Sequence, residues 1–467
     1  MKILVINVSL RPQSPLRLFP IGLGYVATAI KNAGFSFDLL DIDVERYSPA
    51  YVESFLKSNR YDAVCMGCIV TGYKTIKEYA AIIKSAHPQT KIIVGNSVAT
   101  SIPHILLTRT AVDYAVIGEG EQTVVELLHE ISAKRPVDKV KGICFLNGGE
   151  VVTTEPRALI EDISIIPPID FSIFNVDKYI EYSKVYPSDP LPIPREQVRG
   201  LPVNTARGCI ANCGFCYHVF KGVPYRYRSA ASLVAEMRAM IEKYSLNHIY
   251  LLDELTFFSK KQTLELVNAI LDEKLHFYWS GTCRSNLFDR EEDLEIMAKM
   301  KASGCQSMGY SLESADEGIL HDMNKKVLVA HFSRQTKLFH KAGIPVSTSL
   351  VIGYPQETPQ TIKKTFDCCL ENRIYPSAGY LLPQPGSSIY DYARQHGFIK
   401  DEEEYLLLMG DRQDLRLNMT SMPDAQLQNC VLEGLKRCNE VLGVGLSEKE
   451  LVKTLYYRLP KIEKNNA

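Results

Sequence analysis

The first 135 residues alternate short apolar runs with segments in which apolar residues recur every three or four positions. The runs KILVINV, FDLLDI, DAVCMGC, KIIVG and VDYAVIG read as strands, and the amphipathic segments after them read as helices. Continuous apolar strands separated by helices predict a doubly wound, Rossmann-like parallel sheet. Ligands of such sheets bind beyond the carboxyl ends of the strands, which here are the loops at 8–19, 68–72, 95–100 and 118–121.

The alternation stops between residues 136 and 197. VKGICFLNGGEVVTTEPR predicts a small hairpin with a Gly-Gly turn, and the proline-rich stretches ISIIPPIDFSIF and YPSDPLPIPREQ predict extended chain. These features are typical of a surface connector between two domains.

A second alternation of strands and helices runs from Val203 to about Pro385. Its apolar runs are VNTARGC, HIYLLDEL, FYWSGTCR, QSMGYSLES, IPVSTSLVIGYP and PSAGYLLP. Six such units predict a partial (β/α)6 barrel of the TIM type, with its active residues at the carboxyl ends of the strands. Helical stretches follow at roughly 400–409, 423–442 and 447–458. The α/β chain is therefore expected to divide into a first domain (1–135), a connector (136–197), a barrel (198–385) and a mostly helical C-terminal region (386–467).

Composition narrows the classes of protein. Of 467 residues, 46% are apolar and 23% charged, as in ordinary globular proteins. The formal net charge of −1 gives no field that would draw nucleic acid, and no apolar run reaches the roughly 18 residues that cross a bilayer. The short apolar N-terminus, interrupted at Arg11, does not fit a signal peptide, so we expect a cytoplasmic protein. Twelve cysteines in that compartment favour metal or redox chemistry wherever they cluster.

Three cysteines do cluster, in the segment RGCIANCGFCY. Cys209, Cys213 and Cys216 form C-x3-C-x2-C. Structural zinc takes four ligands, usually from two short pairs, and the adjacent Cys368 and Cys369 on a predicted helix would serve poorly as the second pair. Three thiolates suit a [4Fe–4S] cluster with one iron left open to another ligand. The alternative is three buried structural cysteines.

This spacing is the signature of the radical S-adenosylmethionine (SAM) superfamily, which the chain resembles over the whole predicted barrel. The resemblance implies that SAM chelates the open iron, and that an electron from a donor such as flavodoxin or ferredoxin releases a 5′-deoxyadenosyl radical. LLDE, GYSLES and VIGYPQET resemble strand-end motifs of the family, although Gln356 stands where the family has glycine. Strand-end carboxylates are also common helix caps. The implied SAM contacts are Phe215, Tyr217, Asp253, Glu254, Arg284, Glu313 and Gly353.

The first domain resembles the cobalamin-binding domain that many radical SAM enzymes carry. PIGLGYVATAIKNAG, GNSVAT and VIGEGEQTVVELL match its segments, but Asn96 replaces a glycine and Val98 stands where histidine is common. No D-x-H-x-x-G motif offers a histidine to cobalt, and the loop CIVTG is expected to face the metal. The implied cobalamin contacts are Ser9, Leu10, Cys68, Val70, Thr71, Gly72, Gly95, Asn96, Ser97, Gly118, Glu119, Gly120 and Glu121.

The stretch GLGYVA also fits a dinucleotide fingerprint, with Asp41 about 20 residues later. Fingerprint glycines turn directly out of the first strand, whereas this strand ends near Val8 and a long loop follows. We therefore expect Gly22 and Gly24 to lie on a helix that packs closely on the sheet.

The combined resemblance implies a cobalamin-dependent radical SAM enzyme that methylates an unactivated carbon or a phosphinate phosphorus of a small molecule or peptide. Methyl transfer through methylcobalamin is the leading interpretation. An oxidative cyclase or rearrangement enzyme, similar to the anaerobic cyclase of chlorophyll synthesis, is an alternative. A non-catalytic corrinoid or iron–sulfur sensor is a third hypothesis, which the strand-end carboxylates and Arg284 disfavour because a sensor needs no SAM pocket.

Overall fold

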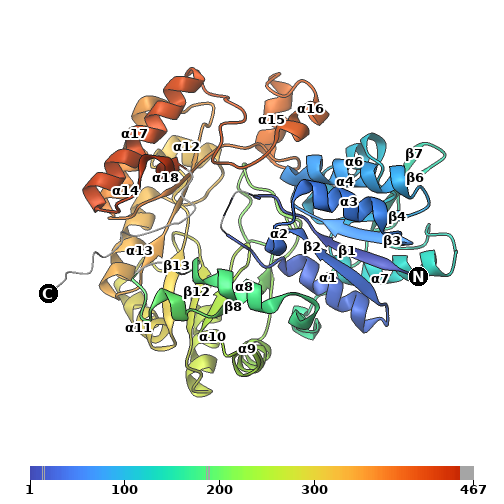
Figure 1. The fold of residues 1–467 in the computed structure, drawn as a ribbon. Helices are drawn as coiled ribbons and strands as arrows, with labels where there is room; N and C mark the ends of the chain where they lie inside the picture. The colour runs from blue at the N-terminus through green and yellow to red at the C-terminus, as the bar shows by residue number, and fades with distance from the viewer. Residues whose placement is uncertain (13, 15, 186, 188–189, 453–467) are drawn as a thin grey trace.

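The computed structural model describes residues 1–452 except 13, 15, 186, 188 and 189. An N-terminal sheet domain, a barrel and a helical C-terminal region lie against one another (Figure 1). The α/β fold expected from the sequence is confirmed in both domains. Among the described residues, no helix is both long and apolar enough to span a membrane.

The N-terminal sheet has seven strands in the order β2-β1-β3-β4-β5-β6-β7. The five parallel strands are β1 (Ile3–Asn7), β2 (Phe37–Asp41), β3 (Ala63–Gly67), β4 (Lys91–Gly95) and β5 (Tyr114–Val116). Two antiparallel strands, β6 (Ile143–Asn147) and β7 (Glu150–Thr153), extend the sheet beyond β5. These two are the predicted Gly-Gly hairpin. It pairs with the sheet instead of standing apart in the connector, because β5 offers it a free edge.

Helices cover both faces of this sheet, as continuous apolar strands require. Along β1, Ile3 and Val5 pack in one apolar cluster with α1 and α7, while Leu4 and Ile6 pack in another with α3 and α4. The helices of the domain are α1 (Ile21–Asn32), α2 (Ile42–Glu45), α3 (Pro49–Ser58), α4 (Tyr73–Ala86), α5 (Ser97–Ser101), α6 (Pro103–Arg109) and α7 (Gly120–Ser132).

The connector packs against the loop that leads into α1. The Phe19 ring lies 4.7 Å from that of Phe171, 4.8 Å from that of Phe174 and 5.0 Å from that of Tyr179, centroid to centroid. Tyr179 belongs to α8 (Val176–Tyr182) and also donates a hydrogen bond to Asp41 at 2.7 Å. The connector is thus an integral part of the domain boundary.

The barrel consists of six parallel strands. They are β8 (Gly200–Val203), β11 (His248–Leu251), β12 (Tyr278–Thr282), β13 (Cys305–Gly309), a fifth strand in two parts, β14 (Val346–Ser347) and β15 (Ser349–Ile352), and β16 (Ser377–Tyr380). β8 ends at Val203, where the sequence predicted its start. The residues after it leave the barrel and form a small ribbon of β9 (Ala206–Arg207) and β10 (Arg226–Tyr227).

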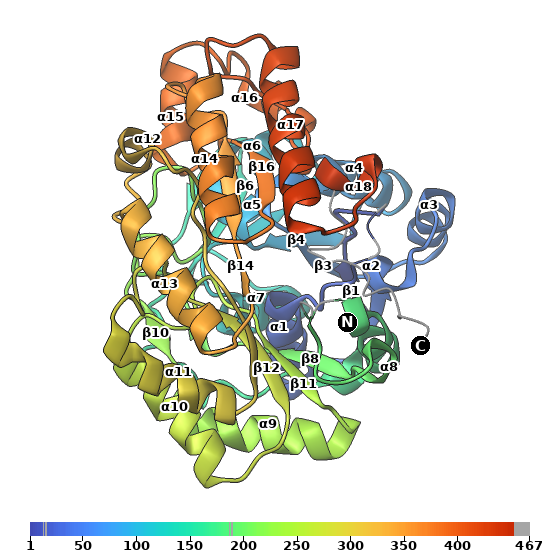
Figure 2. The same ribbon diagram turned by 90° about the vertical axis from the view of Figure 1, so that its left-hand side faces the viewer.

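The barrel helices follow their strands along the chain and pack outside them (Figure 2). They are α9 (Ala230–Tyr244), α10 (Lys260–Asp272), α11 (Leu294–Ala302), α12 (Glu317–Asp322), α13 (Val329–Lys341) and α14 (Pro359–Glu371).

The C-terminal region bridges the two domains. Its helices are α15 (Ser388–Gln395), α16 (Glu402–Leu408), α17 (Asp424–Leu442) and α18 (Glu448–Val452), and the rest of the stretch predicted as helix at 447–458 lies outside the described residues. α17 packs on α14 of the barrel. Glu403 on α16 accepts hydrogen bonds from Tyr73 at 2.9 Å and from Lys77, both on α4 of the sheet domain.

Candidate functional site

The three cysteines lie on one tightly held loop. Lys221 donates hydrogen bonds to the carbonyls of Cys216 at 2.6 Å and Cys213 at 3.1 Å, so the loop curls around its ammonium group. Burial, followed by the nearby Cys213 and Cys209, raises the pKa of Cys216 to about 11, although Lys221 lowers it. Among the described residues, no three His, Cys, Asp or Glu side chains already form a single-ion site, so the cluster assignment rests on the motif and this loop.

Phe215 and Glu313 meet beside this loop, at Lys325. Glu313 is buried with a left-handed backbone (φ 65°), and its Oε1 accepts a hydrogen bond from Lys325 Nζ at 2.7 Å. Its Oε2 is buried with no hydrogen-bond partner among the described residues. The Phe215 ring centroid lies 5.9 Å from the same Nζ. A buried carboxylate oxygen without a partner is costly, which suits a place where a ligand donor binds.

Two other predicted SAM contacts, Asp253 and Arg284, form hydrogen bonds within the protein. Asp253 accepts hydrogen bonds from Asn204 Nδ2 at 2.7 Å and from the backbone N–H groups of Thr205 at 2.7 Å and Ala206 at 3.0 Å. Arg284 donates to the carbonyl of Lys325. Both side chains therefore hold loops in place: Asp253 fixes the turn that leads to the cysteines, and Arg284 fixes the segment that carries Lys325.

The remaining predicted SAM contacts stand at the ends of strands or on the cysteine loop. Glu254 lies just past β11 and accepts a hydrogen bond from the Gly208 N–H at 3.3 Å. Gly353 has a left-handed backbone (φ 112°), and its N–H donates to Glu357 at 3.1 Å. Tyr217 packs so closely on Gly386 that a Cβ there would lie 2.4 Å from its ring.

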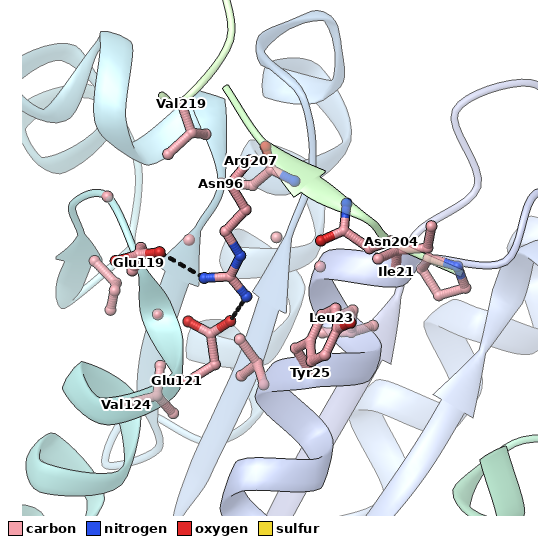
Figure 3. Close-up of a pocket in the computed structure, with 18 of the residues that line it drawn as sticks. Ile21, Leu23, Tyr25, Asn96, Glu119, Glu121, Val124, Asn204, Arg207 and Val219 are labelled. Carbon is pink, nitrogen blue, oxygen red and sulfur yellow. Dashed lines mark hydrogen bonds and ion pairs between the residues drawn. The ribbon is translucent and has the colours of Figure 1, made fainter. Parts of the chain in front are cut away.

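A cavity of about 560 Å³ lies between the two domains. Its floor is the carboxyl edge of the sheet and the first turns of α1 and α7, and its roof comes from the barrel loops (Figure 3). The sheet domain contributes Pro20, Ile21, Gly22, Leu23, Tyr25, Val26, Cys65, Met66, Gly67, Ile93, Gly95, Asn96, Val116, Gly118, Glu119, Gly120, Glu121 and Val124; the barrel contributes Asn204, Arg207, Val219, Phe220, Leu252, Asp253 and Glu254.

Six of the predicted cobalamin contacts line this cavity: Gly95, Asn96, Gly118, Glu119, Gly120 and Glu121. The other seven lie outside its wall. Ser9 donates to Asp43 at 2.7 Å, and the Ser97 hydroxyl accepts a hydrogen bond from the Val70 N–H at 2.9 Å. Cys68 and Gly72 pack against each other and against Leu10. In the loop at 68–72, Thr71 is half-buried and Ile69, which the sequence prediction left out, is the exposed apolar residue.

A buried ion-pair network crosses the cavity from one domain to the other. Arg207 Nη1 lies 2.6 Å from Glu119 Oε1, and its Nη2 pairs with Glu121, as Figure 3 shows. Arg226 also pairs with Glu119, at 3.0 Å. Burial alone would raise the pKa of Glu119, but the Ile160 N–H and the two guanidinium groups outweigh it, so its pKa is lowered. The acidic residues of the GEGE turn therefore face two arginines that flank the cysteine loop, Arg207 before it and Arg226 after it.

Comparison with known protein families identifies the two domains. Residues 12–128 match the B12 binding domain, and residues 203–369 match the radical SAM superfamily. This is a cobalamin-dependent radical SAM enzyme. The expected cofactors, a [4Fe–4S] cluster, SAM and cobalamin, are those of these two domains. As an enzyme, the protein is not the non-catalytic sensor of the third hypothesis.

The radical SAM enzyme has relatives of two kinds. It is 26% identical to an uncharacterised methyltransferase of Pyrococcus horikoshii, over 80% of this chain and 78% of that one. It is 25% identical to the anaerobic magnesium-protoporphyrin IX monomethyl ester cyclase of Cereibacter sphaeroides, over 74% of this chain and 55% of that one. Its fold matches the radical SAM methyltransferase TsrM of Kitasatospora setae with a TM-score of 0.65 and 17% identity, over 85% of this chain and 77% of that one.

Several residues of this radical SAM enzyme's site escaped the sequence prediction. Arg207 and Arg226 were missed because their partners lie about 90 to 110 residues earlier in the chain. Ile21 and Tyr25 line the cavity from one face of α1, a pattern that also reads as ordinary packing. Gly22 and Gly24 lie on α1 as expected. A Cβ at Gly24 would press on Phe19 at 3.0 Å, whereas one at Gly22 would meet nothing within 4 Å.

Proposed function

We propose that this enzyme transfers a methyl group from SAM, by way of the corrinoid, to an unactivated carbon or a phosphinate phosphorus. The observation that carries the proposal is the shared cavity wall: Arg207 lines the cavity at the B12-binding domain and stands two residues before Cys209. A corrinoid in that cavity and a cluster on the cysteine loop would be neighbours.

The residues present fit the three cofactors. Cys209, Cys213 and Cys216 would hold three irons of the cluster. Phe215 offers a ring to the adenine of SAM, and Glu313 Oε2 offers a carboxylate oxygen that lacks a donor. The cavity of about 560 Å³, floored by small residues of the sheet edge, would hold part of a corrinoid. When bound, these groups supply a radical that abstracts hydrogen and a methyl group that can be transferred.

The chain's own contribution is to place these groups and to keep water out. Asp253 fixes the backbone that leads into the cysteine loop, and Lys221 fixes the loop itself, through the hydrogen bonds described above. Arg207 fixes the same loop relative to the B12-binding domain. Such pre-set geometry matters because a radical formed in a loose or wet site would react with the wrong partner. We propose flavodoxin or ferredoxin as the electron donor and the cytoplasm as the compartment.

The cyclase alternative rests on the relative from Cereibacter sphaeroides. The chain spans 55% of that cyclase but 78% of the methyltransferase relative, which favours methyl transfer.

Product analysis tests the proposal. After anaerobic reconstitution with iron, sulfide and cobalamin, the protein should show both cluster and corrinoid absorption. With SAM and a reductant it should release 5′-deoxyadenosine, and S-adenosylhomocysteine should form only when the corrinoid is supplied. Deoxyadenosine without adenosylhomocysteine would favour the cyclase. Cys213→Ala should abolish deoxyadenosine while leaving corrinoid binding intact, and Cys430→Ala on α17 serves as the matched control.

A further inference from the structure

The barrel sheet has one face packed on helices and one face of small polar residues. Tyr310, just after β13, contacts Phe332 and Phe339 of α13, with ring centroids 5.7 and 5.8 Å apart, so Gly309 and Ser311 point to the opposite face. On β15 and β16 the buried Leu350, Ile352, Ala378 and Tyr380 join the apolar cluster that includes α14, and their neighbours along each strand lie on that same opposite face.

We call this opposite face the serine face. It consists mainly of small residues, Thr282, Gly309, Ser311, Ser347, Ser349, Ser377 and Gly379, together with the apolar Val351 between Leu350 and Ile352. Its members touch one another across strands: Ser349 Oγ donates to Ser311 Oγ at 2.9 Å, and a Cβ at Gly309 would lie 3.3 Å from Ser347 Oγ.

The serine face is unlike the interior of a closed barrel, which bulky branched side chains fill. Thr282, Gly309, Ser311, Ser347 and Ser349 are each half-buried although they lie in the middle of the sheet, whereas Ser377 and Gly379 on the edge strand β16 are buried. Small residues leave this face accessible, and their hydroxyl groups can donate hydrogen bonds to a polar molecule.

The Arg412 side chain reaches this face. Residues 411–416 run along the open edge of β16, where the Tyr380 N–H donates to the Arg412 carbonyl at 2.7 Å. The Arg412 side chain crosses Gly379, and a Cβ there would lie 3.1 Å from its Cγ, Cδ and Nη1. Its Nη2 donates to Ser377 Oγ at 3.4 Å. The absence of a side chain at position 379 is what admits the guanidinium group.

Arg412 has no acidic partner among the residues that the structure describes. The two nearest carboxylates in sequence are taken by other arginines: Asp411 pairs with Arg11 at 3.3 Å, and Asp414 pairs with Arg416 at 2.9 Å. A half-buried guanidinium group that has no counter-charge in the described part of the chain can bind a carboxylate or a phosphorus oxyanion.

From this juxtaposition we propose that the methyl acceptor is a polar, anionic molecule whose carboxylate or phosphorus oxyanion binds Arg412 and the serine face. The inference rests on the proposed function, whose substrate class it names. It places Arg412 as a binding residue that selects the acceptor. An apolar lipid is thereby disfavoured as the substrate, because its contact would bury hydroxyl groups and a charge without partners.

Anion binding to the full-length protein tests this without SAM turnover, so a failure of methyl transfer and a failure of this inference remain distinguishable. The probes are methylphosphonate and acetate, titrated by calorimetry at constant ionic strength. Wild-type protein should bind at least one of them. Arg412→Gln should weaken that binding by about tenfold, since a hydrogen bond to a charged group is lost. Arg416→Gln, in the same segment but paired with Asp414, should leave it unchanged.

A second variant distinguishes loss of the anion site from a folding defect in Arg412→Gln. Gly379→Ala keeps the arginine but puts a Cβ against its side chain, and should also weaken binding. The inference is overturned if neither probe binds to the wild type, or if Arg412→Gln and Gly379→Ala bind with unchanged affinity.

Discussion

Arg207 of the barrel and Glu119 of the B12-binding domain form a buried ion pair, with Nη1 and Oε1 2.6 Å apart and each side chain about one-twentieth exposed. The pair joins the GEGE turn of one domain to the ribbon strand that leads into the cysteine loop of the other. Glu121 adds a second carboxylate to the same guanidinium group. Arg207, with Arg226 beside it on Glu119, therefore ties the corrinoid domain to the segments on either side of the cluster loop.

Replacing Arg207 should be costly. Arg207→Met leaves two buried carboxylates short of their cation, and breaking such a buried pair typically costs about 3–5 kcal/mol of unfolding free energy. Chemical denaturation measures the loss. Arg238→Met, which breaks an exposed pair with Glu273, should cost less than about 1 kcal/mol. Equal stability of the two variants would show that the buried network does not hold the domains together.

Acid should weaken the same contact. The folded-state pKa of Glu119 lies below its ordinary value of 4.5, so its ion pairs contribute stability that is complete above pH 4.5 and is lost as the pH falls through the lowered pKa. The unfolding midpoint of the wild type should therefore fall on acidification below that point. Glu119→Gln should be less stable at neutral pH and should show a smaller acid-induced loss. A parallel pH dependence in both proteins would contradict this role of Glu119.

A second carboxylate, that of Glu357, should make the stability depend on pH in the opposite direction. Burial raises the pKa of Glu357 to about 7, against hydrogen bonds from Gly353 and Thr361 that lower it. The folded state then binds a proton that the unfolded chain releases, so stability should decrease as the pH rises from about 4.5 to 7. Glu357→Gln should remove that slope. The comparison needs only thermal melts across this range, and an unchanged slope would locate the titrating group elsewhere.

Loss of any one cluster cysteine should remove the metal centre. Cys209→Ala, Cys213→Ala and Cys216→Ala should each bind less iron and sulfide after reconstitution, because two thiolates cannot hold the cluster as three do. Cys430→Ala should retain a full complement. Iron and sulfide assays decide the matter, and full loading of any of the three variants would exclude that residue as a ligand.

Filling the cavity should block the corrinoid while sparing the fold. Gly22 opens onto the cavity, and a Cβ there would meet nothing within 4 Å, so we expect Gly22→Leu to fold. Its leucine would occupy space that the corrinoid needs, and we expect corrinoid affinity to fall by about tenfold or more. Ala50→Leu adds similar bulk at an exposed position of α3 and is the control. Unchanged affinity of Gly22→Leu would place the corrinoid elsewhere.

Sequence patterns predicted the parallel strands of the N-terminal sheet because these are apolar runs that helices bury on both faces. The strand KILVINV is a clear case, with Ile3 to Ile6 nearly inaccessible to solvent. Sequence patterns were a poorer guide to the role of a side chain that forms hydrogen bonds within the protein. Asp253 was predicted to contact SAM, and the structure adds that its carboxylate accepts hydrogen bonds from the loop after β8, a strand that ends earlier than predicted.

Contacts between residues far apart in the sequence could not be predicted from local motifs. The GEGE turn was predicted at the cavity, where the structure also places it, but its arginine partners could not be read from a turn alone. Arg412 lies in a segment without helical or strand periodicity, so only the fold reveals that it reaches the serine face.

The contact of Glu403 with Tyr73 and Lys77 has a consequence for how the protein is made. The two partners are separated by about 330 residues of chain, and domains generally fold in order from the N-terminus during synthesis. The B12-binding domain is complete on the ribosome long before α16 emerges. The contact between the C-terminal region and this domain is therefore among the last to form, and a nascent chain stopped short of residue 403 would lack it while keeping the Arg207–Glu119 pair.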